Sequence, residues 1–300
     1  MIVFPNCKIN LGLNILRKRA DGFHDLETVF YPLMIKDVLE VVREQAAESG
    51  KMTMDSGEWT VDSSQQTVNR QPSTVNNSIS FTSSGLTIDG DTSNNLCVKA
   101  YHLLKQDFPT LPSIQMHLHK NIPMGAGLGG GSADGAFTLS LLNDKFSLNL
   151  SQQQLMDYAL QLGSDCPFFI LNQPCFATSR GEVMSKIDLD LSAYTFVIVN
   201  PGIHVNTGWA FANIVPSVPQ KSVQQIIQQP IATWKNELVN DFELPVSNQH
   251  PAINSIKQQL YSAGAVYASM SGTGSTVFGI FEKTGKPALS FPESYFTAII

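Results

Sequence analysis

The sequence predicts an α+β fold. Segments with the two-residue period of a strand and segments with helical spacing are mixed along it, without the regular β-α-β alternation of a doubly wound sheet. Its 300 residues, 43% of them hydrophobic and 15% charged, are typical of a globular protein. A chain of this length is expected to form one large or two modest domains.

Elements of the first half follow from apolar spacing and from capping residues. Alternating apolar residues predict strands at residues 6–16, 38–42 and 114–118. Helices are predicted at about 95–104, at about 133–143, and from an expected N-cap at Ser151 to a stop at Gly163.

Residues 45–94 differ from their flanks, because they are rich in Ser, Thr, Gln, Asn and Gly and have only short apolar pairs. We expect a long polar insertion with a poorly ordered tip, and a hairpin is one form that it could take. Residues 48–85 offer few large apolar side chains and are predicted to be dispensable for folding.

In the second half, strands are predicted at 175–178 and 195–199, and residues 216–230 suggest a linker or an exposed helix. The chain ends with a predicted strand pair, 266–270 and 277–281, around a Ser-Gly-Thr-Gly-Ser turn.

Composition excludes several classes of function. The net charge of −6 disfavours nucleic-acid binding, and no apolar run reaches the ~18 residues of a membrane span. Four scattered cysteines without a C-x-x-C pair disfavour a zinc site or a disulfide framework and suit a reducing cytoplasm. No secretory signal is recognisable.

The strongest local signal is the run PMGAGLGGGS at residues 123–132, between a predicted strand and a predicted helix. Its glycines allow close backbone approach to a ligand, and the amides and dipole at the helix start favour phosphate. The run also fits the dinucleotide pattern G-x-G-x-x-G, but the second strand with an acidic end is missing. A nicotinamide-dependent oxidoreductase is therefore the weakest alternative.

This run resembles the second signature of the GHMP kinase superfamily, and segments 8–11 (KINL) and 269–278 resemble the first and third. Within the superfamily, three further segments look like the kinases of 4-diphosphocytidyl-2-C-methyl-D-erythritol. These segments are residues 21–28, 163–168 and 240–243. The resemblance implies a ribosomal-protein-S5-like N-terminal domain, residues 1–185, and a ferredoxin-like C-terminal domain, residues 186–300.

The resemblance implies a catalytic pair, Lys8 and Asp165. An aspartate can take the proton of the attacking hydroxyl while a lysine fixes it and offsets charge. Asp165 also has the position of a helix N-cap, with Pro167 in the first turn, and could do both jobs.

The same resemblance assigns the remaining contacts. Phe23 and Phe211 would stack on cytosine and His24 would hydrogen-bond its polar edge, with Thr207 nearby and Asn10 on the substrate. The implied ATP-binding residues are Asn95, Leu96, Lys120, Pro123, Met124, Gly125, Ala126, Gly127, Leu128, Gly129, Gly130, Gly131 and Ser132.

Asp134 departs from the family pattern as we expect it, since it puts a carboxylate in what should be the first helical turn. A carboxylate near a triphosphate suggests a ligand to the magnesium of Mg-ATP, and a helix-capping role is the alternative.

The sequence thus predicts a cytoplasmic kinase, a monomer or weak homodimer, that uses ATP and Mg²⁺ on a small molecule and binds neither nucleic acid nor membrane. A GHMP kinase for a sugar, homoserine or mevalonate, and a non-catalytic nucleotide-binding relative, remain alternatives.

Overall fold

The structure, a computed structural model, describes residues 1–44, 79–283 and 287–300. Most of the predicted insertion, residues 45–78, lies outside the described residues. The strands are β1 (Ile2–Val3), β2 (Asn6–Lys18), β3 (His24–Lys36), β4 (Val38–Arg43), β5 (Ile79–Gly85), β6 (Ile114–Lys120), β7 (Cys175–Ser179), β8 (Val183–Lys186), β9 (Tyr194–Asn200), β10 (Tyr267–Met270), β11 (Val277–Glu282) and β12 (Phe296–Ile299). The helices are α1 (Leu96–Asp107), α2 (Gly130–Phe146), α3 (Gln152–Leu162), α4 (Cys166–Leu171), α5 (Thr207–Ala212), α6 (Val223–Ile227), α7 (Ile231–Glu237), α8 (Glu243–Gln249) and α9 (Pro251–Ser262).

In the described part of the chain, the strands form three four-stranded sheets with the orders β1-β4-β6-β5, β2-β3-β7-β8 and β10-β11-β9-β12. Neighbouring strands are antiparallel, except that β5 runs parallel to β6. The mixture of segregated helices and mainly antiparallel sheets confirms the predicted α+β class.

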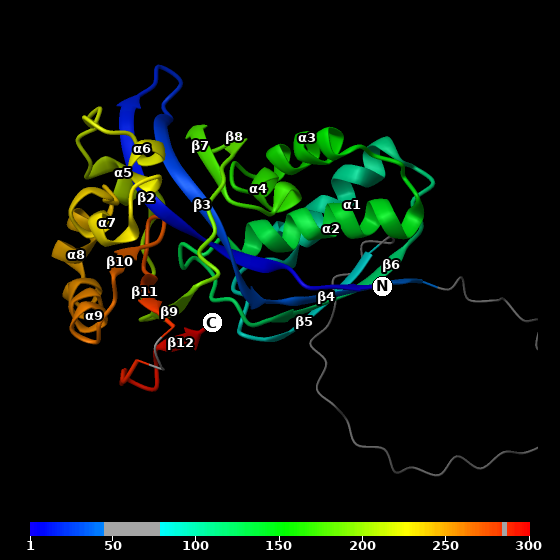
Figure 1. Cartoon of the computed structure of the whole chain (residues 1–300). Coiled ribbons are helices and arrows are strands. Elements are labelled where there is room, and N and C mark those ends of the chain that lie inside the picture. Colours follow the sequence, from blue (N-terminus) through cyan, green and yellow to red (C-terminus); the bar gives the residue numbers. More distant parts are fainter. Residues whose placement is uncertain (45–78, 284–286) are drawn as a thin grey trace, which may run out of the picture.

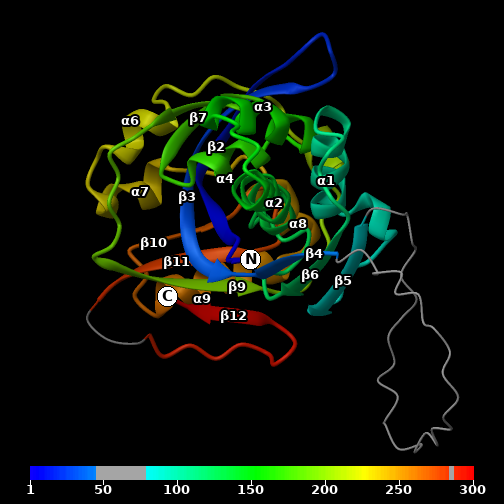
Figure 2. The ribbon, with the colours of Figure 1, turned by 90° about the vertical axis from the view of Figure 1, so that its right-hand side faces the viewer.

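The long strands β2 and β3 lie between two groups of helices (Figure 1). Helices α1 to α4 share one hydrophobic core with β4 and β6, and α8 and α9 share another with β9, β10 and β11. A third core joins β2 and β3 to α6 and to the C-terminal sheet. Figure 2 shows α2 and α4 beside β2 and β3, so the glycine-rich loop that precedes α2 reaches the middle of the molecule.

Strand β2 is buried on both faces over its first ten residues, polar ones included. Its apolar face contributes Ile9 and Leu11 to the core, while Lys8 and Asn10 point to the other side and are equally covered. Burying polar side chains is costly unless they have partners. The polar face of β2 is therefore a place to look for a functional site.

Several predicted elements are confirmed. Helix α1 has its N-cap at Asn95, α3 begins with a capping box at Ser151 and ends at Gly163, and β10 and β11 form the predicted antiparallel pair. Local signals were sufficient for these elements because their caps and turns lie within a few residues of sequence.

Three predictions were wrong. Residues 79–85, assigned to a dispensable insertion, form β5, which pairs with β6 and buries Ile79. Residues 216–230, expected to be a linker or exposed helix, include α6, whose Val223, Ile226 and Ile227 are buried. The third concerns residues 24–36, for which the sequence predicted no strand: they form the long strand β3, which begins at His24.

Strand β3 was missed because its middle is buried on both faces and contains Pro32, so its sequence does not alternate. The division into domains at residue 185 stays a prediction; β8 ends at Lys186 and the C-terminal sheet starts with β9.

Candidate active site

A cavity of about 810 Å³ opens between β2, β3, the glycine-rich loop, the β7–β8 turn and α5. Predicted site residues from distant parts of the chain meet there. Those that line it are Lys8, Asn10, Phe23, His24, Gly127, Gly129, Asp165, Thr207 and Phe211. Sequence reasoning had assigned both catalytic residues and all five substrate-binding residues to this site, and the fold brings all seven to one cavity.

The predicted catalytic pair is in contact. Lys8 Nζ lies 3.3 Å from Asp165 Oδ2 and donates a 2.6 Å hydrogen bond to Asn10 Oδ1. The Lys8 side chain is 4% exposed, whereas that of Asp165 is 38% exposed. The lysine is thus fixed inside the protein, and the carboxylate faces the cavity, where a hydroxyl can reach it.

Asp165 occupies the N-cap position of α4, but its side chain makes no capping hydrogen bond. The expectation that it would also cap the helix is therefore wrong. Its carboxylate is directed to Lys8 instead, and Pro at the first turn of α4 removes a backbone donor that would otherwise need a cap.

Hydrogen bonds tie the three signature segments together. Asn10 donates from Nδ2 to Thr28 Oγ1 at 3.0 Å, and its backbone amide donates to Ser271 Oγ at 3.1 Å. Ser271 Oγ in turn donates to the carbonyl of Gly127 at 2.8 Å. Thr28 and Ser271 belong to segments 21–28 and 269–278, which carry the resemblance, but the sequence assigns neither of them a role. Their hydrogen bonds join segments that are far apart in the chain, and no local pattern encodes such contacts.

The glycine-rich loop fits a phosphate chain. Gly125, Gly127 and Gly129 have φ between +61° and +76°, and a Cβ on Gly127 would lie 2.0 Å from the carbonyl oxygen of Ser271. The 17-residue helix α2 starts next, with no side-chain cap at Gly129, so its first amides remain available to an anion. These features match what the phosphates of ATP require.

Lys120, predicted to bind the nucleotide, lies behind this loop. Its ammonium is fully buried between the carboxylates of Asp37 and Asp134, at 2.7 Å from Asp134 Oδ2. A Cβ on Gly130 would lie 3.0 Å from Lys120 Nζ, so the lysine supports the start of α2 from inside. Asp37 Oδ1 also accepts hydrogen bonds from the backbone amides of Asn121 and Ile122. No sequence signal distinguished Asp37 from other acidic residues.

Asp134 stands in the second turn of α2, since the helix begins at Gly130 and not, as expected, near residue 133. Its Oδ1 has no hydrogen-bond partner among the described residues. Burial, with the Asp37 carboxylate adding to it, raises the pKa of Asp134 to about 8, although the Lys120 ammonium opposes this rise. In the described residues no cluster of three or more metal-ligating side chains occurs.

The predicted base-binding residues form an aromatic group. His24 and Phe211 stack with ring centroids 4.8 Å apart and planes at 21°, and Phe211 packs edge-on against Phe242. Burial, followed by the charge of Lys18, lowers the pKa of His24, which favours the neutral imidazole. Phe23 is half exposed at the cavity mouth, where the guanidinium of Arg180 lies 4.9 Å from its ring.

The two residues predicted for the adenine pocket have structural tasks. Asn95 accepts a 2.9 Å hydrogen bond from the Cys97 amide and so caps α1. Leu96 packs on α2, where a Cβ on Gly135 would approach it to 2.9 Å. Neither lines the cavity described above.

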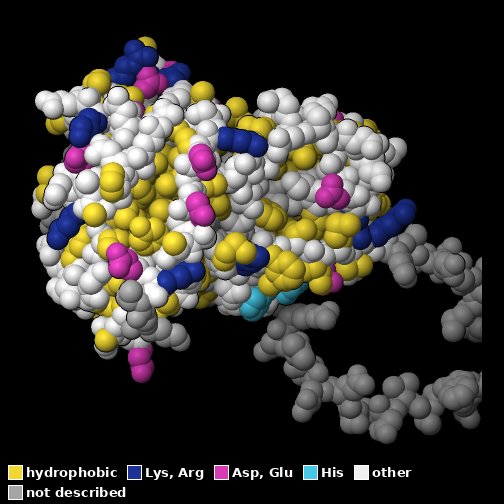
Figure 3. Space-filling view, viewed as in Figure 1, with side chains coloured by type: hydrophobic (Ala, Val, Ile, Leu, Met, Phe, Trp, Pro, Cys, Tyr) yellow, Lys and Arg dark blue, Asp and Glu magenta, His cyan; other side chains and the backbone are white. Residues whose placement is uncertain are grey.

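The surface and helices add two observations. On the face in Figure 3, most basic side chains are scattered singly. At the tip of the β2–β3 hairpin several of them gather, together with acidic side chains. No helix in the described ranges combines the length and apolarity needed to cross a membrane.

Comparisons with known proteins agree with this geometry. The model of the GHMP kinases N terminal domain matches residues 95–173, and that of the GHMP kinases C terminal domain matches residues 223–290. Mevalonate kinase of Methanococcus jannaschii shares the fold, with a TM-score of 0.61 at 11% identity over 94% of this chain and 91% of that one. The fold and the site define a GHMP kinase.

The more similar relatives are of one kind. Two of them, from Bacteroides fragilis and Bacteroides thetaiotaomicron, are named 4-diphosphocytidyl-2-C-methyl-D-erythritol kinase and are 48% and 47% identical to this chain. Each alignment covers 95% of this chain, and the two alignments cover 94% and 93% of the respective relative. A crystal structure of 4-(cytidine 5'-diphospho)-2C-methyl-D-erythritol kinase matches with a TM-score of 0.72 at 26% identity, over 93% of this chain and 90% of that chain. The chain belongs to the 4-diphosphocytidyl-2-C-methyl-D-erythritol kinase family.

Proposed function

We propose that this protein transfers the γ-phosphoryl group of ATP to the 2-hydroxyl of 4-diphosphocytidyl-2-C-methyl-D-erythritol. One observation carries the proposal: the Lys8–Asp165 pair shares a cavity with the His24–Phe211 stack and borders the glycine-rich loop. A phosphoryl acceptor with a flat base at one end and a hydroxyl at the other matches that arrangement.

The chemistry asks for positioning and charge stabilisation more than for covalent catalysis. Asp165 Oδ1 or Oδ2 accepts the proton of the attacking hydroxyl, and the Lys8 ammonium holds the carboxylate and offsets charge that develops next to it. Asn10 keeps Lys8 in place through its 2.6 Å hydrogen bond and adds a polar contact for the substrate.

The base is proposed to rest on the aromatic group. Stacking on Phe211 and Phe23 gives affinity for any flat base, and the neutral imidazole of His24 can both donate and accept a hydrogen bond along the polar edge of cytosine. Thr207 at the start of α5 provides a further hydroxyl beside Phe211.

The ATP phosphates are assigned to the loop from Pro123 to Ser132 and to the start of α2. Mg²⁺ would supply charge neutralisation on those phosphates, and it commonly takes only one or two protein carboxylates. The sequence predicts Asp134 as a ligand of that magnesium. Its Oδ1 has no partner among the described residues, but Oδ2 is paired with Lys120 and Asp134 does not line the cavity, so the magnesium dependence of Asp134→Asn decides between a metal role and a structural one.

Two further expectations stay proposals. A cytoplasmic location is supported by four cysteines that are all buried as free thiols. The sequence prediction of a monomer or weak homodimer is retained as well.

A coupled ADP-release assay with a panel of alcohols tests the proposed function. The panel comprises 4-diphosphocytidyl-2-C-methyl-D-erythritol, mevalonate, homoserine and a hexose. We expect ADP release with the first compound and only background release with the others. Preference for another alcohol would identify a different GHMP kinase activity, and ATP binding without turnover of any alcohol would identify a non-catalytic relative.

A further inference from the structure

Arg180 is a cation of the cavity that neither the motifs nor the resemblance assigned. It sits in the turn between β7 and β8 and lines the cavity, with its guanidinium carbon 4.9 Å from the centroid of the Phe23 ring. Its side chain is about one-third exposed. An arginine that lies on an aromatic ring at the mouth of a cavity is positioned to meet whatever the cavity binds.

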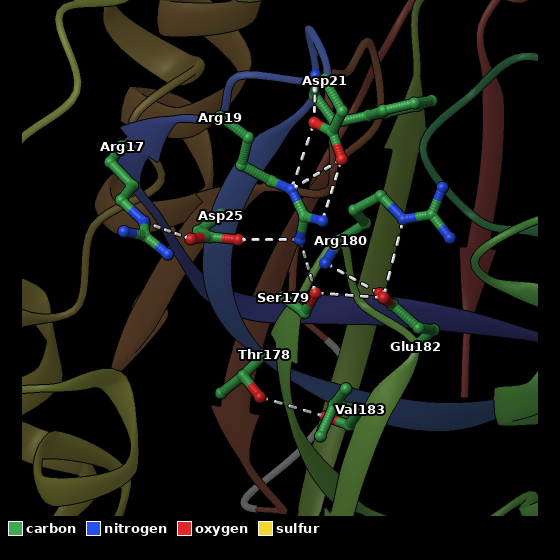
Figure 4. A network of polar contacts seen from close by, with 10 residues as sticks. Arg17, Arg19, Asp21, Asp25, Thr178, Ser179, Arg180, Glu182 and Val183 are labelled. Atoms are coloured by element: carbon green, nitrogen blue, oxygen red, sulfur yellow. Dashed lines mark hydrogen bonds and ion pairs between the residues drawn. The ribbon is translucent and has the colours of Figure 1, made fainter.

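Figure 4 shows how Arg180 is held. Its Nε lies 3.5 Å from Glu182 Oε1, and its backbone amide donates a 2.7 Å hydrogen bond to Glu182 Oε2. Ser179 Oγ donates to the same carboxylate at 3.0 Å and accepts a 3.1 Å hydrogen bond from Arg19 Nη1. The β7–β8 turn is thereby connected to the β2–β3 hairpin, which carries Phe23.

The outer edge of the guanidinium remains available. No hydrogen bond or ion pair within the described residues engages the two Nη nitrogens of Arg180, and Figure 4 draws no dashed line to them. Glu182 fixes the inner edge at Nε, so the two Nη groups form a preorganised pair of donors. That geometry matches two oxygens of a phosphate group.

The neighbouring glycine places Arg180 near the reacting end of the cavity. A Cβ on Gly181 would lie 3.8 Å from Asp165 Oδ1 and 3.6 Å from the Phe30 ring. Arg180 therefore stands between Phe23, where the base is proposed to stack, and Asp165, where the hydroxyl is proposed to react. A group that links the two ends of the substrate would run close to it.

A diphosphate linker needs a cation along this path. Lys8 is already engaged by Asp165 and Asn10. Lys18, another cationic residue of the lining, pairs across the hairpin with His24 at the base end. We propose that Arg180 binds the diphosphate linker of the cytidine-linked substrate and selects for a nucleoside diphosphate over a nucleoside. This inference rests on the proposed function.

Binding of CDP and of cytidine, with saturating ADP present to fill the loop, tests this inference by calorimetry. We expect the wild-type protein to bind CDP more tightly than cytidine, and Arg180→Gln to lose roughly 10- to 100-fold in CDP affinity, the range for hydrogen bonds to charged groups. Cytidine affinity and the KM for ATP should stay unchanged. Arg180→Lys should recover part of the CDP affinity. Arg17→Gln is the matched control, because Arg17 belongs to the same network but is largely exposed and does not line the cavity.

Three outcomes would overturn the inference, the first two without touching the proposed function. An equal loss for CDP and cytidine in Arg180→Gln would mean that Arg180 only supports the Phe23 ring. A preference for CDP that survives in Arg180→Gln would mean that another group binds the diphosphate. Wild-type protein that binds neither CDP nor cytidine would remove the proposed function, and the inference with it; either of the first two outcomes would leave the proposed function intact.

Discussion

Two buried lysines, each paired with aspartate, flank the glycine-rich loop, and they differ in how closed their surroundings are. Lys8 meets Asp165, whose side chain is 38% exposed to the cavity. Lys120 meets Asp37 and Asp134, and all three side chains are almost completely buried. Burial penalises the charged form of Lys120, but the two carboxylates outweigh it and raise its pKa.

The difference separates catalysis from support. A carboxylate that faces a cavity can exchange its lysine partner for a substrate hydroxyl. In the closed triad of Lys120, Asp37 and Asp134, such an exchange would leave a buried charge without a partner. The sequence resemblance assigned both lysines to chemistry or nucleotide binding. We expect Lys8 to keep that role, because its partner faces the cavity, and we expect Lys120 to hold α2, and with it the glycine-rich loop, against β6.

The largest expected effect concerns the Lys8–Asp165 pair, which is open to the cavity. Asp165→Asn should lower kcat by at least ~100-fold, because the amide cannot accept the hydroxyl proton. The Asp165 side chain is 38% exposed and makes no capping hydrogen bond, so the melting temperature should change little. Steady-state kinetics together with calorimetric melting checks both. Near-normal turnover in folded Asp165→Asn would remove this residue from catalysis.

Substrate selection should depend on the open region as well. Phe211→Ala removes a stacking surface worth roughly 1–3 kcal/mol per base, and should weaken the cytidine substrate about five- to a hundredfold. ATP affinity should hold, because the ATP phosphates are assigned to the glycine-rich loop and Phe211 belongs to α5. KM values for both substrates test this. Parallel losses for ATP and the cytidine substrate would contradict a base-binding role; His24→Ala should behave in the same way.

The closed triad should be visible in the pH dependence of stability. The unfolded Asp134 ionises near pH 3.8, whereas burial raises the pKa of the folded residue to about 8 against the opposing charge of Lys120. The stability that this proton contributes is fully present below pH 3.8 and is lost as the pH rises through 8. The free energy of unfolding of the wild type should therefore fall more steeply from pH 5 to 8 than that of Asp134→Asn. Urea titrations at several pH values measure the two slopes, and equal slopes would argue against a raised pKa.

The smallest expected effect concerns magnesium. Asp134→Asn should leave the magnesium concentration for half-maximal rate unchanged, since Oδ2 is already occupied by Lys120 and the residue does not line the cavity. Initial rates over a magnesium series at fixed ATP provide the measurement. A several-fold higher requirement would instead support the metal role that the sequence predicts.

The predictability of each part depended on how local its signal is. Lys8, Asp165 and the glycine-rich loop stand in short segments whose chemistry is explicit, and helices such as α3 carry their own caps. Strand β5 could not be recognised, because Ser and Thr dominate it and its stability comes from parallel pairing with β6, a partner about 35 residues away.

Contacts between distant segments were equally hidden. Asp37 closes a triad with residues more than 80 positions along the chain, and nothing around it in the sequence announces a partner. Arg180 is positioned by the contact between the β2–β3 and β7–β8 hairpins, which the hydrogen bond from Arg19 to Ser179 joins. In both cases the residue type was visible but its surroundings existed only after folding.

The most direct test of the central comparison measures turnover and stability for both lysines under one set of conditions. Lys8→Met should fold with a nearly unchanged melting temperature, because the exposed Asp165 can be hydrated, and should lose at least ~100-fold in kcat. Lys120→Met combined with Asp134→Asn, which avoids leaving two unpaired buried carboxylates, should lower the melting temperature while the folded fraction keeps kcat within about tenfold. An active Lys8→Met, or a stable but inactive Lys120→Met/Asp134→Asn, would contradict the account.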